Sequence, residues 1–209
     1  MVNQVIGGSM REFILLSLKG STNGDKFNIE HKTEAGLICR TISNSLWVSQ
    51  GIRKDTIIHV VLNGAPRPPR TITFSSNHIP HEFPFDETGV SKVIKKALIM
   101  GKDLLDDEEK SVMDGVTVSK KSFEALVRER ATNLAVYYLH NKGEDIRTIR
   151  FPEHVVFVFG DLFGIPKQTE KLLERTCTGR IKLGPYMLFA SHCPILVHNE
   201  LDRVEKGMR

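Results

Sequence analysis

The chain has 209 residues, of which 40% are hydrophobic and 26% are charged, values typical of a globular protein with a sizeable core. This composition excludes a wholly disordered chain, a collagen-like chain and a membrane protein with several spans. The 29 lysines and arginines exceed the 25 aspartates and glutamates, and the net charge of +4 permits a polyanionic partner without demanding one.

The first half of the chain alternates strand-like and helix-like segments, which is the pattern of an α/β domain. An apolar run predicts a buried strand over 13–18. Apolar residues four apart predict a helix over 33–50, with Gly51 as its C-terminal stop. A continuous β-branched run predicts a central strand over 56–62, covered on both faces. A shorter strand is expected over 71–74, after a proline-rich loop.

The middle of the chain continues this alternation. We expect a loop over 75–88 and an amphipathic helix over 90–98, where apolar residues recur at helical spacing. The acidic run at 106–110 is typical of a solvated surface loop or helix end. A helix over 122–132 and a strand over 134–140 follow.

The last third is predicted to hold a buried strand over 154–160, a polar helix over 168–175 and a strand over 180–183. A final helix containing 195–204 carries five large apolar residues, too many for one face of a solvated helix, so part of its surface is expected to be buried in a core or a dimer. No linker or repeat interrupts the chain. One domain over 10–209 is therefore expected.

The N-terminal segment lacks a charged region followed by an apolar core, so it does not predict a signal peptide. We expect residues 1–9 to be an added leader and the native chain to begin at Met10. No apolar stretch is long enough to predict a membrane span.

The cysteines and histidines give no pattern of metal ligation. Cys39, Cys177 and Cys193 lack CxxC spacing, and the eight histidines form no HExxH motif, so we expect no disulfide framework and no metal. Sparse, unpaired cysteines favour the reducing cytoplasm. No GxSxG motif indicates a nucleophilic serine.

Three loops, 140–145, 160–166 and 183–188, follow predicted strands, and open α/β sheets bind ligands at the carboxyl ends of strands. Their glycines, with few cations close by, favour an adenosine ligand over a phosphate. The GxGxxG motif and the P-loop lysine are both missing, which argues against dinucleotides and nucleoside triphosphates. The alternative is that these glycines only form turns.

Six segments are specific in combination. They are MREF at 10–13, CRTISNSLWVSQGIRKD at 39–55, VLNGAPRPPRTITF at 61–74, YYLH at 137–140, FVFGDLFGI at 157–165 and LGPYMLFASHCPILVHNELD at 183–202. Together they resemble the archaeal tRNA pseudouridine-54 N1-methyltransferase family, one of the SPOUT methyltransferases, over nearly the whole chain. The resemblance implies a SPOUT α/β fold with a C-terminal deep trefoil knot. It also implies S-adenosyl-L-methionine as methyl donor, tRNA as substrate and a homodimer.

By this resemblance, the three loops are the knot loops that hold the methyl donor. The residues implied to contact it are Leu139, Gly160, Leu183, Gly184, Pro185, Tyr186, Met187, Leu188 and Cys193. Relatives often read LSPLEL where this chain has LGPYML, so backbone contacts are expected to persist while side-chain roles change. The missing Cβ of Gly160 would let the backbone approach the donor closely. Cys193 is expected to line the pocket without acting as a nucleophile.

Methylation of pseudouridine at N1 requires the departure of the N1 proton, which calls for a carboxylate or a stabiliser of the anionic ring. Arg53-Lys54-Asp55 is an RxD element similar to one in ribosomal-RNA pseudouridine N1-methyltransferases. Asp55 is the candidate for contacting or deprotonating the uracil edge, and Arg53 for holding a phosphate or base oxygen. A surface Arg–Asp pair is the alternative. Asp161 is the second candidate, although an aspartate after a strand also caps turns.

RNA contact is expected from arginines around one helix and one proline-rich loop, namely Arg40, Arg53, Arg67 and Arg70. Ordinary solvated charge is the alternative. Three further functions stay open: a non-catalytic RNA-binding member of the same fold, a methyltransferase for another RNA, and an enzyme that binds an adenosine ligand and acts on a small molecule.

Overall fold

A computed structural model describes residues 9–30, 33–106 and 108–208. The strands are β1 (Met10–Ser17), β2 (Trp47–Val48), β3 (Gly51–Ile52), β4 (Thr56–Leu62), β5 (Arg70–Ser75), β6 (Glu109–Met113), β7 (Val116–Ser119), β8 (Ala135–Asp145), β9 (His154–Gly160) and β10 (Gly179–Lys182). The helices are α1 (Thr33–Leu46), α2 (Glu87–Met100), α3 (Phe123–Ala131), α4 (Lys167–Thr176) and α5 (Cys193–Glu205). Short 3-10 turns are η1 (Gly24–Lys26), η2 (Ile146–Thr148) and η3 (Ala190–His192). Apart from Ser9, the predicted leader lies outside the described residues.

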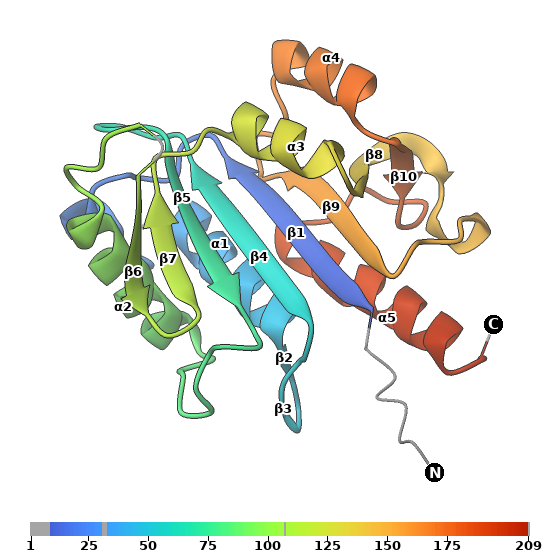
Figure 1. Cartoon of the computed structure of the whole chain (residues 1–209), viewed down its shortest axis with the longest axis horizontal. Coiled ribbons are helices and arrows are strands. Elements are labelled where there is room, and N and C mark those ends of the chain that lie inside the picture. Colours follow the sequence, from blue (N-terminus) through green and yellow to red (C-terminus); the bar gives the residue numbers. More distant parts are fainter. Residues whose placement is uncertain (1–8, 31–32, 107, 209) are drawn as a thin grey trace.

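One eight-stranded sheet runs through the molecule in the order β10-β8-β9-β1-β4-β5-β7-β6 (Figure 1). The strands from β10 to β4 are parallel, whereas β5, β7 and β6 are antiparallel to their neighbours. Because β8, β9 and β10 are parallel neighbours, their carboxyl ends meet at one edge of the sheet, as the predicted ligand rim requires. The mixed α/β class is confirmed.

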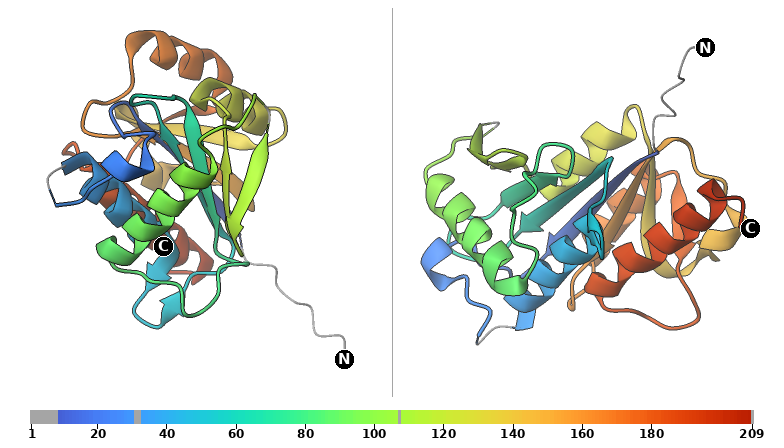
Figure 2. Two further views of the ribbon diagram at one scale, coloured as in Figure 1. Left: turned by 90° about the vertical axis from the view of Figure 1, so that its left-hand side faces the viewer. Right: turned by 90° about the horizontal axis from the view of Figure 1, so that it is seen from below.

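Helices cover both faces of the sheet (Figures 1 and 2). Side chains alternate along β1, so Phe13 and Leu15 point to one face while Ile14 and Leu16 point to the other. The first pair packs in the core that α1, α2 and α5 close. The second pair packs in the core beneath α3 and α4. Among the described residues, no helix is long and apolar enough to cross a membrane.

Most predicted elements are confirmed, with the largest errors at two places. The helix predicted over 33–50 ends at Leu46, and β2 and β3 form a small hairpin next to it. Gly51 is therefore no helix stop: it begins β3 with a φ of +136°, which glycine adopts without strain. The strands β6 and β7 were not predicted. β6 is a short edge strand that begins with Glu109 and Lys110 and so resembles a surface loop, and β7 has only four residues.

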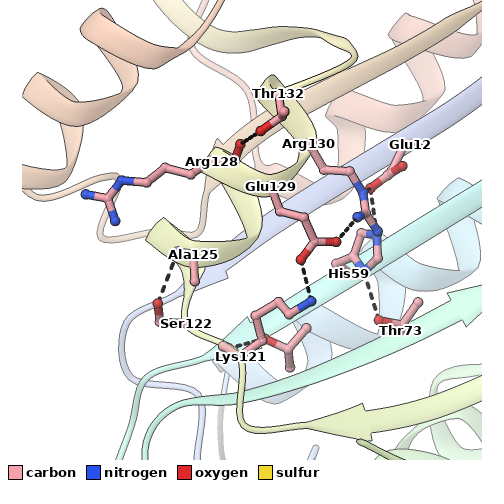
Figure 3. Close-up of polar contacts among 11 residues, drawn as sticks. Glu12, His59, Thr73, Lys121, Ser122, Ala125, Arg128, Glu129, Arg130 and Thr132 are labelled. Carbon is pink, nitrogen blue, oxygen red and sulfur yellow. Dashed lines mark hydrogen bonds and ion pairs between the residues drawn. The ribbon is translucent and has the colours of Figure 1, made fainter. Parts of the chain in front are cut away.

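Buried polar contacts fix α3 to the sheet (Figure 3). The carboxylate of Glu12, on β1, is 1% exposed and lies 2.8 Å from His59 Nε2, while His59 Nδ1 lies 2.8 Å from the Thr73 hydroxyl. Arg130 of α3 donates to the same carboxylate. Burial by itself raises the pKa of Glu12, but the bonds and charges of His59 and Arg130 outweigh it and lower the pKa to about 2. The carboxylate stays ionised and joins three elements.

Candidate functional site

A cavity of about 340 Å³ opens at the carboxyl ends of β8, β9 and β10. Its lining includes every residue predicted to contact the donor except Pro185: Leu139, Gly160, Leu183, Gly184, Tyr186, Met187, Leu188 and Cys193. These residues come from three separate segments that the parallel strands bring together. A volume of this size is in the range of small-molecule sites.

The first wall of the cavity is an irregular stretch of β8. The strand pairs with β9 as far as Tyr138, and its pairing with β10 jumps from Tyr138 to Glu144. The intervening residues 139–143 have no partner in either ladder. The Lys142 amide donates to His140 Nδ1 at 3.1 Å, and other backbone groups of this stretch, such as those of Leu139, face the cavity without a strand partner. At the end of this bulge the chain passes so close to β10 that a Cβ on Gly143 would lie 2.5 Å from the Ile181 backbone, so only glycine fits there. The predicted loop at 140–145 is thus part of β8: residues 140–143 fall in the bulge, and Glu144 and Asp145 pair with β10.

The second wall is the tight turn after β9. A Cβ on Gly160 would lie 2.6 Å from the carbonyl carbon of Gly164. The turn itself therefore requires glycine, and the expected close approach of the donor to Gly160 stays a prediction. Asp161 closes the same turn: one carboxylate oxygen accepts from Ser17 Oγ at 2.8 Å and from the Leu18 amide, and the other accepts from the Phe163 amide at 2.9 Å.

These contacts occupy Asp161 as a turn cap. Burial raises the pKa of its carboxyl group, although the three hydrogen bonds oppose that rise. The carboxylate points toward β1 and its own turn, so the capping role, which the sequence left open, is the one that the geometry supports.

The third wall is the loop between β10 and α5. Tyr186 and Met187 are both 83% exposed, so the tip of the loop projects from the cavity. Leu183 and Leu188 are partly buried and pack against the core, which gives the cavity an aliphatic side. A Cβ on Gly184 would meet nothing within 4 Å, so this glycine borders open space. The loop offers backbone and aliphatic surface rather than charge.

Cys193 lies at the start of α5, where its Sγ lies 3.5 Å from the carbonyl oxygen of Phe189. Its side chain is buried, and burial raises the pKa of the thiol to about 12. A thiol with this pKa is protonated at neutral pH and is a poor nucleophile. The geometry agrees with a passive, pocket-lining cysteine.

The RxD element lies elsewhere on the chain. Arg53 donates to both carboxylate oxygens of Asp202 on α5, at 3.2 and 2.7 Å. Asp55 has a φ of +54° and exchanges hydrogen bonds with the Asn77 side chain, each at 2.9 Å. The two residues do not pair with each other in these contacts. Arg53 is therefore held by Asp202, and not by the surface pair with Asp55 that was the alternative.

Asp202, which binds Arg53, also belongs to a buried hydrogen-bond network with Arg11 and His198. Arg11 of β1 donates to Asp202 at 2.6 Å and lies 3.0 Å from His198 Nδ1. His198 Nε2 lies 2.9 Å from the Ser45 carbonyl oxygen. Since a guanidinium only donates and a carbonyl only accepts, the ring carries its proton on Nε2 and is neutral. Burial, together with the charges of Arg53 and Arg11, lowers the pKa of His198 to about 3.

Within one chain, the RxD element lies at the amino ends of the parallel strands, and the cavity lies at their carboxyl ends. Arg11, which pairs with Thr56, donates its amide to the Asp55 carbonyl, whereas Leu16 pairs with Gly160 beside the cavity. From Arg11 to Leu16 the strand β1 advances five residues at about 3.3 Å each, so the RxD element and the cavity are roughly 16 Å apart along the strand. A small reacting group cannot touch both within a single chain.

The predicted RNA-binding arginines fall in different environments. Arg67 is exposed in the loop before β5, and Arg40 is exposed but pairs with Glu87 at 3.0 Å. Arg70 is 3% exposed and donates to the carbonyl oxygens of Gly101, Lys102 and Pro69. The prediction for Arg70 is wrong, because its guanidinium caps the C-terminal end of α2 and is not available to RNA.

Sequence reasoning missed two residues at the mouth of the cavity. His140 on β8 and Glu170 on α4 both line it, and His140 Nε2 lies 3.2 Å from the Glu170 carboxylate. The loop over 140–145, which begins at His140, was already assigned to the ligand rim, so His140 could have been found there. Nothing local indicates Glu170, which lies thirty residues further along the chain.

The family model described as "Putative SAM-dependent RNA methyltransferase" matches residues 10–206. A "Putative pseudouridine methyltransferase" of Shewanella frigidimarina is 35% identical over 195 residues, covering 92% of this chain and 98% of the relative. Its counterpart in Vibrio vulnificus is 35% identical over 198 residues, covering 94% of this chain and all of the relative.

Solved structures agree in fold. Archaeoglobus fulgidus Nep1, bound to S-adenosylhomocysteine, has a TM-score of 0.60 at 12% identity, covering 95% of this chain and 99% of that chain. The SpoU methyltransferase AviRb of Streptomyces viridochromogenes, in complex with AdoMet, has a TM-score of 0.50 at 12% identity, covering 98% and 61%. The SPOUT-type fold is confirmed, and the trefoil knot stays a prediction. The chain belongs to the S-adenosyl-L-methionine-dependent RNA methyltransferase family whose model it matches over nearly its whole length.

Proposed function

We propose that the protein transfers a methyl group from S-adenosyl-L-methionine to N1 of a pseudouridine in tRNA, with position 54 in the T-loop as the expected target. The observation that carries this proposal is the cavity at the carboxyl ends of β8, β9 and β10, formed by the residues that the family resemblance assigns to the donor. The pseudouridine methyltransferase relatives support the choice of base.

The residues of the cavity fit the donor. Backbone groups of residues 139–143 that the strand ladders leave unused can form hydrogen bonds with an adenine edge, which needs one donor and one acceptor in one plane. Leu183 and Leu188 offer an aliphatic surface to the flat base. Gly184 leaves room beside it. Side chains of these types hold an adenosine by shape and backbone contact, without the cations that a phosphate needs.

S-adenosyl-L-methionine supplies an electrophilic methyl group when it is bound. The chain's own task is to hold the acceptor nitrogen in line with that group and to exclude water. The buried, protonated thiol of Cys193 adds apolar wall and does not compete for the methyl group. The acceptor proton must go to a carboxylate or water near the base.

For the proton, we propose Asp55, oriented by Asn77, with Arg53 holding an RNA oxygen. Since this element and the cavity lie about 16 Å apart in one chain, the RxD element of one copy would serve the cavity of a second.

A homodimer is supported by exposed apolar side chains on α5. These are Ile195, Leu196 and Val204, which are 47%, 36% and 50% exposed. A sedimentation experiment giving a monomer at micromolar concentration would contradict this arrangement. We further propose that the enzyme works in the cytoplasm.

The test is transfer of a labelled methyl group to matched RNA substrates. We expect label in a tRNA that carries pseudouridine at position 54 and none in the same transcript with uridine there. Equal labelling of both transcripts would refute the choice of base. Labelling of ribosomal RNA alone would keep the enzyme class and refute tRNA as substrate.

A further inference from the structure

A second cavity, of about 310 Å³, lies at the carboxyl end of β1. The loop after β1, the turn η1 and the start of α1 form its walls. Its charged lining residues are Lys19, Lys26 and Glu34, and the buried ring of Phe27 contributes an apolar surface. The cavity therefore combines two cations with a single carboxylate. None of the residues assigned to the donor lines it.

Contacts of the turn after β9 connect the surroundings of the two cavities. Asp161, which lines the donor cavity, accepts hydrogen bonds from Ser17 Oγ and the Leu18 amide, immediately before Lys19. The Lys19 ammonium lies 3.9 Å from the centroid of the Phe163 ring, in the turn that follows β9. A ligand that enters the donor cavity from the surface can therefore extend over this turn to the second cavity.

The charges of Lys19 and Lys26 are not neutralised within the described part of the chain. Neither forms an ion pair with a described residue, and the Lys19 ammonium lies over the aromatic ring of Phe163 instead. By contrast, Lys120 and Lys121 each pair with a carboxylate. Two exposed ammonium groups at the rim of one cavity are suited to an anion with several oxygens, such as a phosphodiester.

We propose that Lys19 and Lys26 bind a backbone phosphate of the acceptor RNA, close to the nucleotide that receives the methyl group. This inference rests on the proposed RNA methyltransferase function. RNA is the source of phosphate that fits best, because the Phe163 ring is 44% exposed beside Lys19 and can stack on an unpaired base. A free phosphate would gain nothing from that ring.

The test compares two double variants with the same change in charge. Lys19→Gln/Lys26→Gln removes the proposed contacts, and Lys102→Gln/Lys110→Gln removes two exposed lysines at the β6–β7 end of the sheet. Fluorescence anisotropy measures the binding of unfractionated tRNA over a salt series, and calorimetry measures the binding of S-adenosyl-L-methionine. Thermal melts confirm that both variants are folded.

We expect the Lys19/Lys26 variant to bind tRNA about tenfold more weakly than the control at low salt, with a salt slope reduced by about 1, the value for one lost phosphate contact. Donor affinity should be unchanged in both variants. Glu34→Gln should strengthen tRNA binding, because it removes the opposing charge.

Equal tRNA affinities and salt slopes in the two double variants would overturn the inference, while methyl transfer by the wild type would leave the proposed function intact. A wild-type protein that binds the donor but no tRNA at low salt would refute both. Weakened binding of the donor itself in the Lys19/Lys26 variant would show that the two lysines serve the donor cavity instead.

Discussion

The buried histidine behind Arg53 predicts a measurable loss of stability in mild acid. His198 has a pKa of about 3 in the folded protein, against about 6.5 in an unfolded chain. Because the folded value is the lower one, the unfolded chain takes up the proton first. The stabilisation is thus present above pH 6.5 and is lost progressively as the pH falls toward 3.

The size of the effect follows from linkage. Between pH 7 and pH 5 the unfolded histidine becomes protonated while the folded one stays neutral. At about 1.4 kcal/mol per pKa unit, the free energy of unfolding should fall by about 2 kcal/mol from this residue alone. Because the ring in the folded protein becomes charged only near pH 3, the network of Arg11 and Asp202 around it should stay intact between pH 7 and pH 5.

The assay is urea denaturation at pH 7 and pH 5 for the wild type and for His198→Gln. Glutamine can accept from Arg11 and donate to the Ser45 carbonyl but does not titrate, so the variant should lose about 2 kcal/mol less than the wild type between the two pH values. A constant cost of the substitution cancels in this difference. His81→Gln, at an exposed histidine, is the control. The same pH dependence in wild type and His198→Gln would refute the reasoning.

Four further substitutions test the site and its support. Gly184→Val should weaken donor binding at least tenfold with little change in melting temperature, since its side chain enters open space, and calorimetry checks this. Cys193→Ala should keep methyl transfer within a few fold; complete inactivity with normal donor binding would contradict the passive role. Arg53→Ala should lower turnover on tRNA at least tenfold while donor affinity is unchanged, and unchanged turnover would show that the RxD assignment is wrong. Glu12→Gln should cost about 3 kcal/mol of unfolding free energy by urea denaturation, because it leaves His59 and Arg130 without their buried anion.

The regular elements of the fold could be predicted because their patterns are local. The strands over 56–62 and 154–160 were predicted with the bounds that the structure has, since continuous β-branched or aromatic runs between polar segments allow few alternatives. The β2–β3 hairpin was missed because Trp47 and Val48 continue the apolar pattern of α1. Pairing between short strands depends on tertiary contacts that no local pattern records.

In the candidate site, too, some residues could be predicted from the sequence and others could not. The cavity lining was predicted because parallel strands place their following loops at one edge, and the family resemblance selected residues within those loops. The partners of Arg53 were not predicted, because Asp202 lies 149 residues away and meets it only once α5 packs beside the sheet. Arg70 shows the converse error: a basic residue in a proline-rich stretch looked exposed, yet its place at the start of β5 buries it beneath the end of α2.

The central claim is that this cavity delivers a methyl group to N1 of pseudouridine. The most direct measurement is mass spectrometry of nucleosides from tRNA incubated with the protein and isotopically labelled S-adenosyl-L-methionine. We predict a pseudouridine one methyl group heavier, with the label on the base and not on the ribose, and no such product with Gly184→Val. Label on a ribose or on another base, or no label in pseudouridine-containing tRNA despite donor binding, would contradict the claim.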